Sequence, residues 1–273
     1  MPTLECYCPR WGAEGQAWPE FAARVRDAGY DGVEWGFPRD VDPRELDAAW
    51  DACAKQDLPI IAQHWDTIDV DFPAHRRHYE AWWRLLEGRP LRKVNSQTGR
   101  DVFGLRQNET LFGVAAGFAE AYQTAVCHET HRGKWSFAAH VTRDYLERLP
   151  ALRLTLDISH WVCVGESFLA DQPAATALAI SRADHLHARV GHLQGPQVPD
   201  PRVPAAREAL DRHLAWWDQV WARHRDEGAE AITVTPEFGP APYMTHLPGS
   251  GAPIADQWAI NVFVMNLLRQ RWA

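Results

Sequence analysis

The stretch TAVCHETHRGKWSFAAHVTRDYLERLPALRLTLDIS, residues 124–159, contains a strand, a helix and a second strand. TAVCHET and LRLTLDIS are short runs rich in apolar and β-branched residues, a composition typical of strands. Between them, HVTRDYLERL carries apolar residues at helical spacing. A strand, a helix and another strand in this order favour two parallel strands joined by a crossover helix.

The same alternation runs along the whole chain. Six further stretches have the character of strands: LECYCP, DGVEW, LPIIAQHW and LRKVNSQ before this unit, and DHLHARV and AITVTPEF after it. Helical patterns separate them, such as WPEFAARVRDAG, PRELDAAWDACAKQ and EALDRHLAWWDQVWARHRDEG. Eight repeats of strand and helix predict an α/β fold closed into a (β/α)8 TIM barrel, in preference to an open doubly wound sheet. We expect residues 1–273 to form a single domain, because barrels of about 250 residues often fold as one.

The composition limits the partners of the chain. Its net charge is -8, and no stretch gathers Lys and Arg densely enough to bind phosphate backbones, so we expect no nucleic-acid partner. Nowhere do about 18 apolar residues run together, so we expect no membrane span. The start of the chain lacks a basic segment followed by a long apolar run, so we expect no targeting segment. The five cysteines are dispersed without a CxxC pair, which fits a protein of the reducing cytoplasm.

Polar residues gather at the carboxyl ends of the last four predicted strands. Side chains alternate across a strand, so residues two apart share a face. In LRLTLDIS, Leu154 and Leu156 share the face expected to contact helices, which leaves Asp157 on the inner face. The same alternation in the three neighbouring strands directs one acid or one histidine from each toward the barrel axis. The converging residues are Glu129, Asp157, His187 and Glu237.

Three carboxylates and an imidazole at one partly dry point would repel one another unless a cation lies among them. A divalent metal ion removes that cost. Oxygen and nitrogen ligands without a thiolate suit Mn²⁺, Mg²⁺, Co²⁺ or Zn²⁺, and we take Mn²⁺ as the first choice. Taken singly, each residue has a plainer explanation, a solvated strand end or a structural histidine. The alignment of four registers favours the metal site.

Five motifs resemble those of the xylose-isomerase-like TIM-barrel superfamily of sugar isomerases and epimerases: AGYDGVEW, HETHRG, LDISHW, HLHARVG and TPEFGP. The resemblance covers nearly the whole chain. It implies that the four converging residues bind a divalent cation, and that His160, three residues after the aspartate, contacts the substrate. HARVGHLQGPQVPDP and HETHRGKW depart from the ketose epimerases, so the resemblance leaves the substrate open.

The resemblance implies an isomerase or epimerase acting on a small carbohydrate, either a sugar or a sugar phosphate. A bound metal would stabilise the enediolate that forms when the proton next to the carbonyl leaves, with Glu129 and Glu237 as base and acid. A metal-promoted hydride shift is the second choice. Six residues are expected to contact the substrate: His160, Arg189, His131, Trp161, His64 and Glu34. The long loops GPQVPDPRVP and HLPGSGAP, which begin at Gly195 and His246, are expected to form walls or lids of the site.

Several other functions compete with this one. A metal-dependent lyase or dehydratase and a non-catalytic carbohydrate-binding barrel both fit the same fold. Endonuclease IV-like DNA repair is disfavoured, because the chain is acidic and its DRH motif at Asp211 falls in a predicted helix. A serine hydrolase is disfavoured, because Asp157, Ser159 and His160 are too close in sequence for a relay. The Trp-rich helix LAWWDQVW is compatible with packing in the core or against a second copy in a homo-oligomer.

Overall fold

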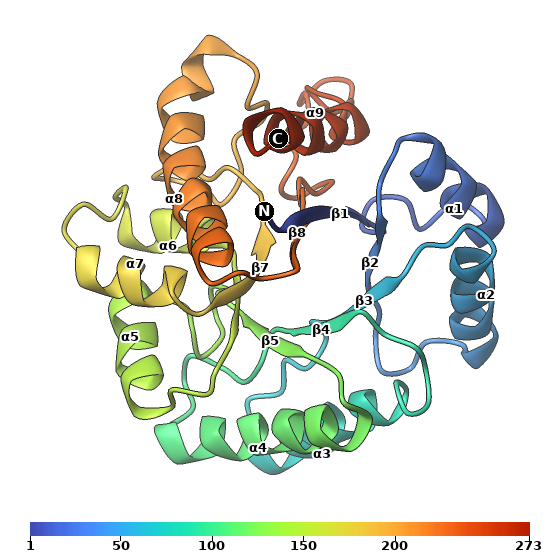
Figure 1. Cartoon of the computed structure of the whole chain (residues 1–273), viewed down its shortest axis with the longest axis vertical. Helices are drawn as coiled ribbons and strands as arrows, with labels where there is room; N and C mark the ends of the chain where they lie inside the picture. Colours follow the sequence, from blue (N-terminus) through green and yellow to red (C-terminus); the bar gives the residue numbers. More distant parts are fainter.

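The computed structural model describes residues 1–273 and contains a closed barrel of eight parallel strands. Each strand pairs with the next in sequence, and β8 pairs with β1 to close the barrel (Figure 1). The strands are β1 (Thr3–Pro9), β2 (Gly32–Gly36), β3 (Ile60–His64), β4 (Lys93–Ser96), β5 (Val126–Glu129), β6 (Leu154–Leu156), β7 (Ala183–His187) and β8 (Ala231–Thr235). The predicted (β/α)8 barrel is confirmed, and every predicted strand overlaps an observed one.

Helices surround the barrel on its outer side (Figure 1). They are α1 (Trp18–Asp27), α2 (Pro43–Ala54), α3 (Phe72–Arg84), α4 (Leu105–Tyr122), α5 (Ala139–Arg148), α6 (Ile158–Gly165), α7 (Pro173–Ile180), α8 (Arg207–Asp226) and α9 (Gln257–Arg271), with a 3₁₀ turn η1 (Pro204–Ala206) before α8. Helices α2, α3 and α9 begin after an aspartate whose carboxylate accepts a hydrogen bond from a first-turn N–H. None of these helices has the length and apolar character needed to cross a membrane.

Much of the apolar packing lies between the strands and the helices. Leu154 and Val234, on two strands of the barrel, belong to the same buried cluster as Trp217 of α8. The inside of the barrel carries polar groups instead. There the Lys93 ammonium on β4 donates a hydrogen bond of 3.0 Å to the Thr233 hydroxyl on β8. The barrel therefore buries charged and polar side chains at its centre, where they can build a site.

One predicted strand ends earlier than expected. Strand β6 stops at Leu156, and Asp157 caps the short helix α6 by accepting a hydrogen bond of 3.0 Å from the Ser159 N–H. Ser159 and His160 lie in the first turn of α6 and not on a strand. The physical reason is that aspartate is a strong N-cap, so a helix can begin as soon as the chain leaves the sheet. Asp157 itself still joins the residues at the centre of the barrel.

Two neighbouring residues of α8 test the packing of the helices on the barrel. Trp217 is fully buried, whereas Trp216 is partly exposed. We expect Trp217→Ala to lower the free energy of unfolding by about 3–5 kcal/mol, because it removes a buried indole and leaves a cavity. Trp216→Ala is the matched control and should cost clearly less. Urea titrations followed by circular dichroism measure both, and equal losses would contradict this packing.

Candidate metal centre

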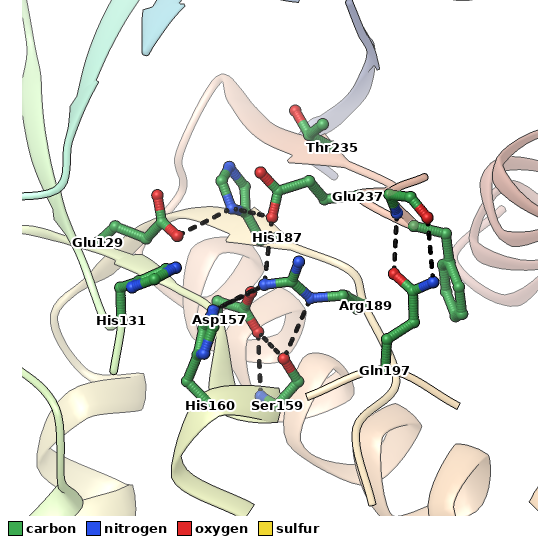
Figure 2. Close-up of polar contacts among 12 residues, drawn as sticks. Glu129, His131, Asp157, Ser159, His160, His187, Arg189, Gln197, Thr235 and Glu237 are labelled. Carbon is green, nitrogen blue, oxygen red and sulfur yellow. Dashed lines mark hydrogen bonds and ion pairs between the residues drawn. The ribbon is translucent and has the colours of Figure 1, made fainter. Parts of the chain in front are cut away.

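The four predicted ligands converge at the carboxyl end of the barrel, and Figure 2 shows their side chains close to one another. Glu129 ends β5 and His187 ends β7, whereas Asp157 follows β6 by one residue and Glu237 follows β8 by two. Their ligand atoms all lie within 4.8 Å of one another, and all four residues are buried. The structure therefore brings together the set that strand alternation predicted.

Negative charge dominates this cluster. Burial opposes a charge on His187 most strongly, but the carboxylates of Glu237 and Glu34 outweigh it and raise the pKa of the imidazole well above its usual value. Burial also raises the pKa of Asp157 to about 6, despite the neighbouring Arg189 guanidinium. Both shifts favour the protonated form of the group and so reduce the net negative charge of the cluster. A cation bound at this point would offset that charge.

The donor atoms fit a divalent metal ion. His187 Nδ1 and Glu237 Oε2 are buried and form an ion pair at 2.9 Å, but neither atom has a partner with the geometry of a hydrogen bond. Buried polar atoms without partners are rare in native proteins and call for an explanation. A metal ion held by Glu129, Asp157 and these two atoms would satisfy both. Three carboxylates and one imidazole suit Mn²⁺, Mg²⁺, Co²⁺ or Zn²⁺.

Glu34 orients the histidine of the cluster. Its Oε1 lies 3.0 Å from His187 Nε2, which leaves Nδ1 as the ring nitrogen that faces the three acids. The other oxygen of Glu34 lies 3.1 Å from His185 Nε2 and accepts a hydrogen bond from the Thr235 hydroxyl. A carboxylate behind a ligating histidine fixes the ring and increases its basicity. Glu34 was expected to contact the substrate, but its carboxylate is buried on β2 and does not line the cavity.

Carboxamides hold two of the acids in place. Gln63 Nε2 on β3 donates to Glu237 Oε1 at 3.0 Å and to Glu129 Oε2 at 3.4 Å. Asn95 on β4 donates to Glu129 Oε2 at 3.0 Å, and Gln97 donates to the same oxygen at 3.2 Å. Donors of this kind favour the ionised carboxylate. Although burial opposes the charge most strongly, His187, His131 and the Asn95 amide lower the pKa of Glu129 to about 2.

These three amides were not predicted from the sequence. Gln63 and Asn95 are polar residues inside predicted strands, and that was the available signal. A carboxamide in a strand carries no charge and so does not suggest a metal ligand. When buried, it nevertheless needs hydrogen-bond partners, as an acid does.

Arg189 is the cation already present at the cluster. Its guanidinium donates to Asp157 Oδ2, lies 2.8 Å from His160 Nε2 and approaches Glu237 Oε2 to 3.5 Å (Figure 2). Beside it, the rings of His131 and His160 are 3.9 Å apart between centroids. Arg189 and His131 line the central cavity, as expected of substrate contacts. His160 is fully buried behind them and does not line it, so this imidazole supports its two neighbours instead of reaching the substrate directly.

A cavity of about 710 Å³ opens above the cluster. Its aromatic walls are Trp11, Trp65 and Tyr243, which follow β1, β3 and β8 in the sequence. The two long loops that begin at Gly195 and His246 contribute none of its lining, so the expectation that they form its walls is wrong. The second of these loops instead closes back on itself through a bridge between His246 and Pro253.

Trp161 and His64, both expected at the site, point elsewhere. Trp161 lies in α6, where its indole is buried in the apolar core and donates a hydrogen bond of 2.8 Å to the Ser136 carbonyl. His64 faces outward from β3, because Gln63 takes the inward position. Its ring packs against Tyr79 and Trp82 of α3. Neither residue reaches the cavity.

The fold is similar to that of several solved structures. The D-psicose 3-epimerase of Clostridium cellulolyticum H10, solved with D-tagatose, aligns with a TM-score of 0.61 and 14% identity over 100% of this chain and 99% of that chain. A probable 3-DHS dehydratase of Bacillus anthracis aligns with a TM-score of 0.61 and 16% identity over 99% and 100%. A family 2 AP endonuclease of Brucella melitensis aligns with a TM-score of 0.55 and 14% identity over 88% and 94%.

Identities at this level establish the fold and not the activity. The resemblance to xylose-isomerase-like barrels is confirmed as a likeness of fold. A scan of protein families and a search of curated proteins return no match to the sequence. The three similar structures are named as an epimerase, a dehydratase and an endonuclease. The shared fold therefore does not identify the activity, which depends on the residues of this site.

The contact between Glu34 and His187 predicts a loss of metal affinity in Glu34→Gln. The amide cannot supply the negative charge behind the imidazole, so we expect divalent-ion binding to weaken about 10- to 100-fold. Calorimetric titration of the metal-free protein with Mn²⁺ measures this. The matched control is Glu5→Gln, which changes another strand glutamate, one that pairs with Arg92 away from the cluster. Unchanged affinity in Glu34→Gln would contradict the role assigned to Glu34.

Metal binding should also depend on pH. His187 carries a proton at neutral pH in the metal-free protein, because its pKa is raised well above its usual value. A protonated imidazole cannot ligate a metal, so binding must release that proton, and the apparent affinity should fall as the pH is lowered, about tenfold per unit for each proton displaced. Titrations in buffers with different ionisation enthalpies count the protons released. A count of zero at pH 7 would exclude His187 as a ligand.

Proposed function

We propose that the protein is a divalent-metal-dependent isomerase or epimerase that moves a proton at a carbon next to the carbonyl of a sugar or sugar derivative. The observation that carries this proposal is the buried cluster in which Glu129 and Glu237 share the Gln63 amide at the floor of a cavity. Two carboxylates beside one substrate position can act as base and acid. The epimerase among the structures with the same fold gives the proposal further support.

The residues of the chain divide the work of proton transfer. Glu129 is ionised at neutral pH, since its pKa is about 2, and it therefore can accept the α-proton. Glu237 accepts a hydrogen bond from the same Gln63 amide and would donate to the substrate a proton taken up from solvent, while the proton accepted by Glu129 would leave to solvent. Addition of the proton to the neighbouring carbon gives isomerisation. Addition to the same carbon from its opposite face gives epimerisation. Arg189 and His131 would hold substrate oxygens by hydrogen bonds.

The residues at the floor of the cavity would hold the metal ion, with Mn²⁺ as our first choice. When bound, a divalent ion supplies Lewis acidity that lowers the pKa of the substrate's α-carbon. The aromatic walls limit the access of water to the reacting carbon, which strengthens the electrostatic contacts inside. We further propose that residues 1–273 act as one domain. The five free cysteines lead us to place the protein in the cytoplasm.

A dehydratase is the second candidate, and the structure of the Bacillus anthracis protein favours it over other rivals. The first step would be the same removal of an α-proton by Glu129. The reaction would differ afterwards, because a hydroxyl on the next carbon would leave as water and produce a conjugated carbonyl. The two reactions are therefore separated by their products and not by the residues that begin them.

A panel of ketoses and aldoses incubated with the Mn²⁺-loaded protein in D₂O tests the proposal. We expect deuterium at the carbon next to the carbonyl, detected by NMR. Glu129→Gln and Glu237→Gln should each slow incorporation by about 10²–10⁴-fold, which is the usual contribution of a general acid or base. Glu120→Gln, an exposed glutamate of α4, is the matched control and should leave the rate unchanged.

The other outcomes identify the alternatives. Loss of water from the substrate, with a new absorbance of a conjugated carbonyl, would show that the protein is a dehydratase and not an isomerase. Turnover without deuterium incorporation would indicate a hydride shift. Binding of sugars without any turnover would indicate a carbohydrate-binding barrel.

A further inference from the structure

One wall of the central cavity carries positive charge that no carboxylate of the chain neutralises. Arg100, Arg132 and Lys134 all line the cavity, and none has a carboxylate oxygen within 4.0 Å. Arg189, the fourth cation of the lining, is already paired with Asp157. The net charge of the chain is -8, so unpaired cations at one site are not a consequence of a basic composition.

Lys134 is the most unusual of the three. It is only 5% exposed, and its ammonium contacts two backbone carbonyls, of Thr67 at 3.2 Å and of Trp65 at 3.4 Å. Burial, together with the nearby charge of Arg100, lowers its pKa to about 8. At neutral pH the ammonium is therefore mostly charged, although Glu129, Asp66 and Asp101 act on it only from beyond 4.0 Å. A buried charge of this kind is costly until a partner arrives.

Arg132 offers donors to the cavity. Its guanidinium lies 4.9 Å from the centre of the Tyr243 ring, and Arg189 lies 4.7 Å from the same ring. Its other polar contact is a long one, 3.4 Å from Nη1 to His160 Nδ1. Stacking on an aromatic ring fixes the plane of the guanidinium and leaves most of its five N–H donors available. That planar fork matches the oxygens of a carboxylate or a phosphate.

We propose that the substrate carries a carboxylate or phosphate group remote from its carbonyl, and that Arg132, with Arg100 and Lys134 beside it, binds this anion. The inference rests on the proposed function, because it places the carbonyl end at the metal cluster. The volume of about 710 Å³ leaves space for a substrate that spans both ends of the cavity. The one acid at the rim, Glu14, is exposed and accepts hydrogen bonds from the Gly12 N–H, so it does not neutralise the wall.

A structural explanation competes with this one. Lys134 and Arg100 both donate to backbone carbonyls of the loop between β3 and α3, at Thr67 and Ile68, so they stabilise that loop as well. Arg132 has no such contact, and its substitution therefore separates ligand binding from loop stability. The decisive variants are Arg132→Gln and Arg132→Lys. Arg148→Gln, an exposed arginine at the end of α5, is the matched control.

The experiment compares one neutral ketose with two anionic relatives that have the same number of carbon atoms. Calorimetry of the Mn²⁺-loaded protein with D-fructose, fructose 6-phosphate and 5-ketogluconate distinguishes a phosphate from a carboxylate. We expect one of the anions to bind about 10- to 100-fold more tightly than fructose, as charge-assisted hydrogen bonds to arginine would give. Arg132→Gln should remove most of this preference, Arg132→Lys should keep part of it, and Arg148→Gln should keep all of it.

Two results would overturn the proposal. One is equal affinity of the wild-type protein for fructose and for both anions. The other is an Arg132→Gln variant that loses affinity for fructose and the anions to the same extent. Deuterium exchange keeps this test separate from the proposed function. Anion preference without exchange on any substrate would exclude the isomerase and retain the anion site. Exchange on ketoses together with equal affinity for neutral and anionic ketoses would retain the isomerase and exclude the anion site.

Discussion

The burial of three carboxylates around His187 is the constraint on which the rest of the site depends. Charged groups leave water only when other groups replace its hydrogen bonds and its screening. The barrel meets this requirement with amides from β3 and β4, a guanidinium from the segment after β7 and the imidazole itself. The remaining shortage of positive charge is what makes the cluster a place for a divalent ion. Without such an ion, two of its donor atoms have no hydrogen-bond partner.

The barrel and its metal cluster could be predicted because strand alternation has a period of two and parallel strands end on one side of the sheet. Glu129 and His187 follow that rule directly. Asp157 reaches the cluster by a different local structure, as the N-cap of α6 and not as a strand residue. The prediction of its direction succeeded because a one-residue extension beyond β6 continues the strand's alternation before the helix turns the chain away.

Other residues could not be placed from sequence, for two physical reasons. Strand β3, IIAQH, is buried on both faces, so its pattern does not show which of Gln63 and His64 faces inward, and the titratable residue was the wrong choice. Trp11 and Tyr243 line the cavity from loops, where they are positioned by their contact with each other and not by a period. Trp65 directly follows β3 and lies within the predicted strand LPIIAQHW. Trp161 was expected at the cavity because the sequence pattern did not indicate helix α6. That helix places the indole in the apolar core.

The cavity has a polarity that acts on whatever enters it. Its floor holds the acids Glu129 and Glu237, and one of its walls holds unpaired cations. An anionic group directed toward the floor would meet like charge in a site of low dielectric constant, where repulsion is strong. The same group directed toward Arg132 would meet hydrogen-bond donors without a competing carboxylate. Both ends of the cavity thus favour the same orientation of the ligand, with its anionic group at the wall and away from the floor. Selection of one orientation would place a single α-carbon of the substrate beside Glu129. The cations of the wall would therefore contribute to the choice of the reacting carbon, although they do not contact that carbon.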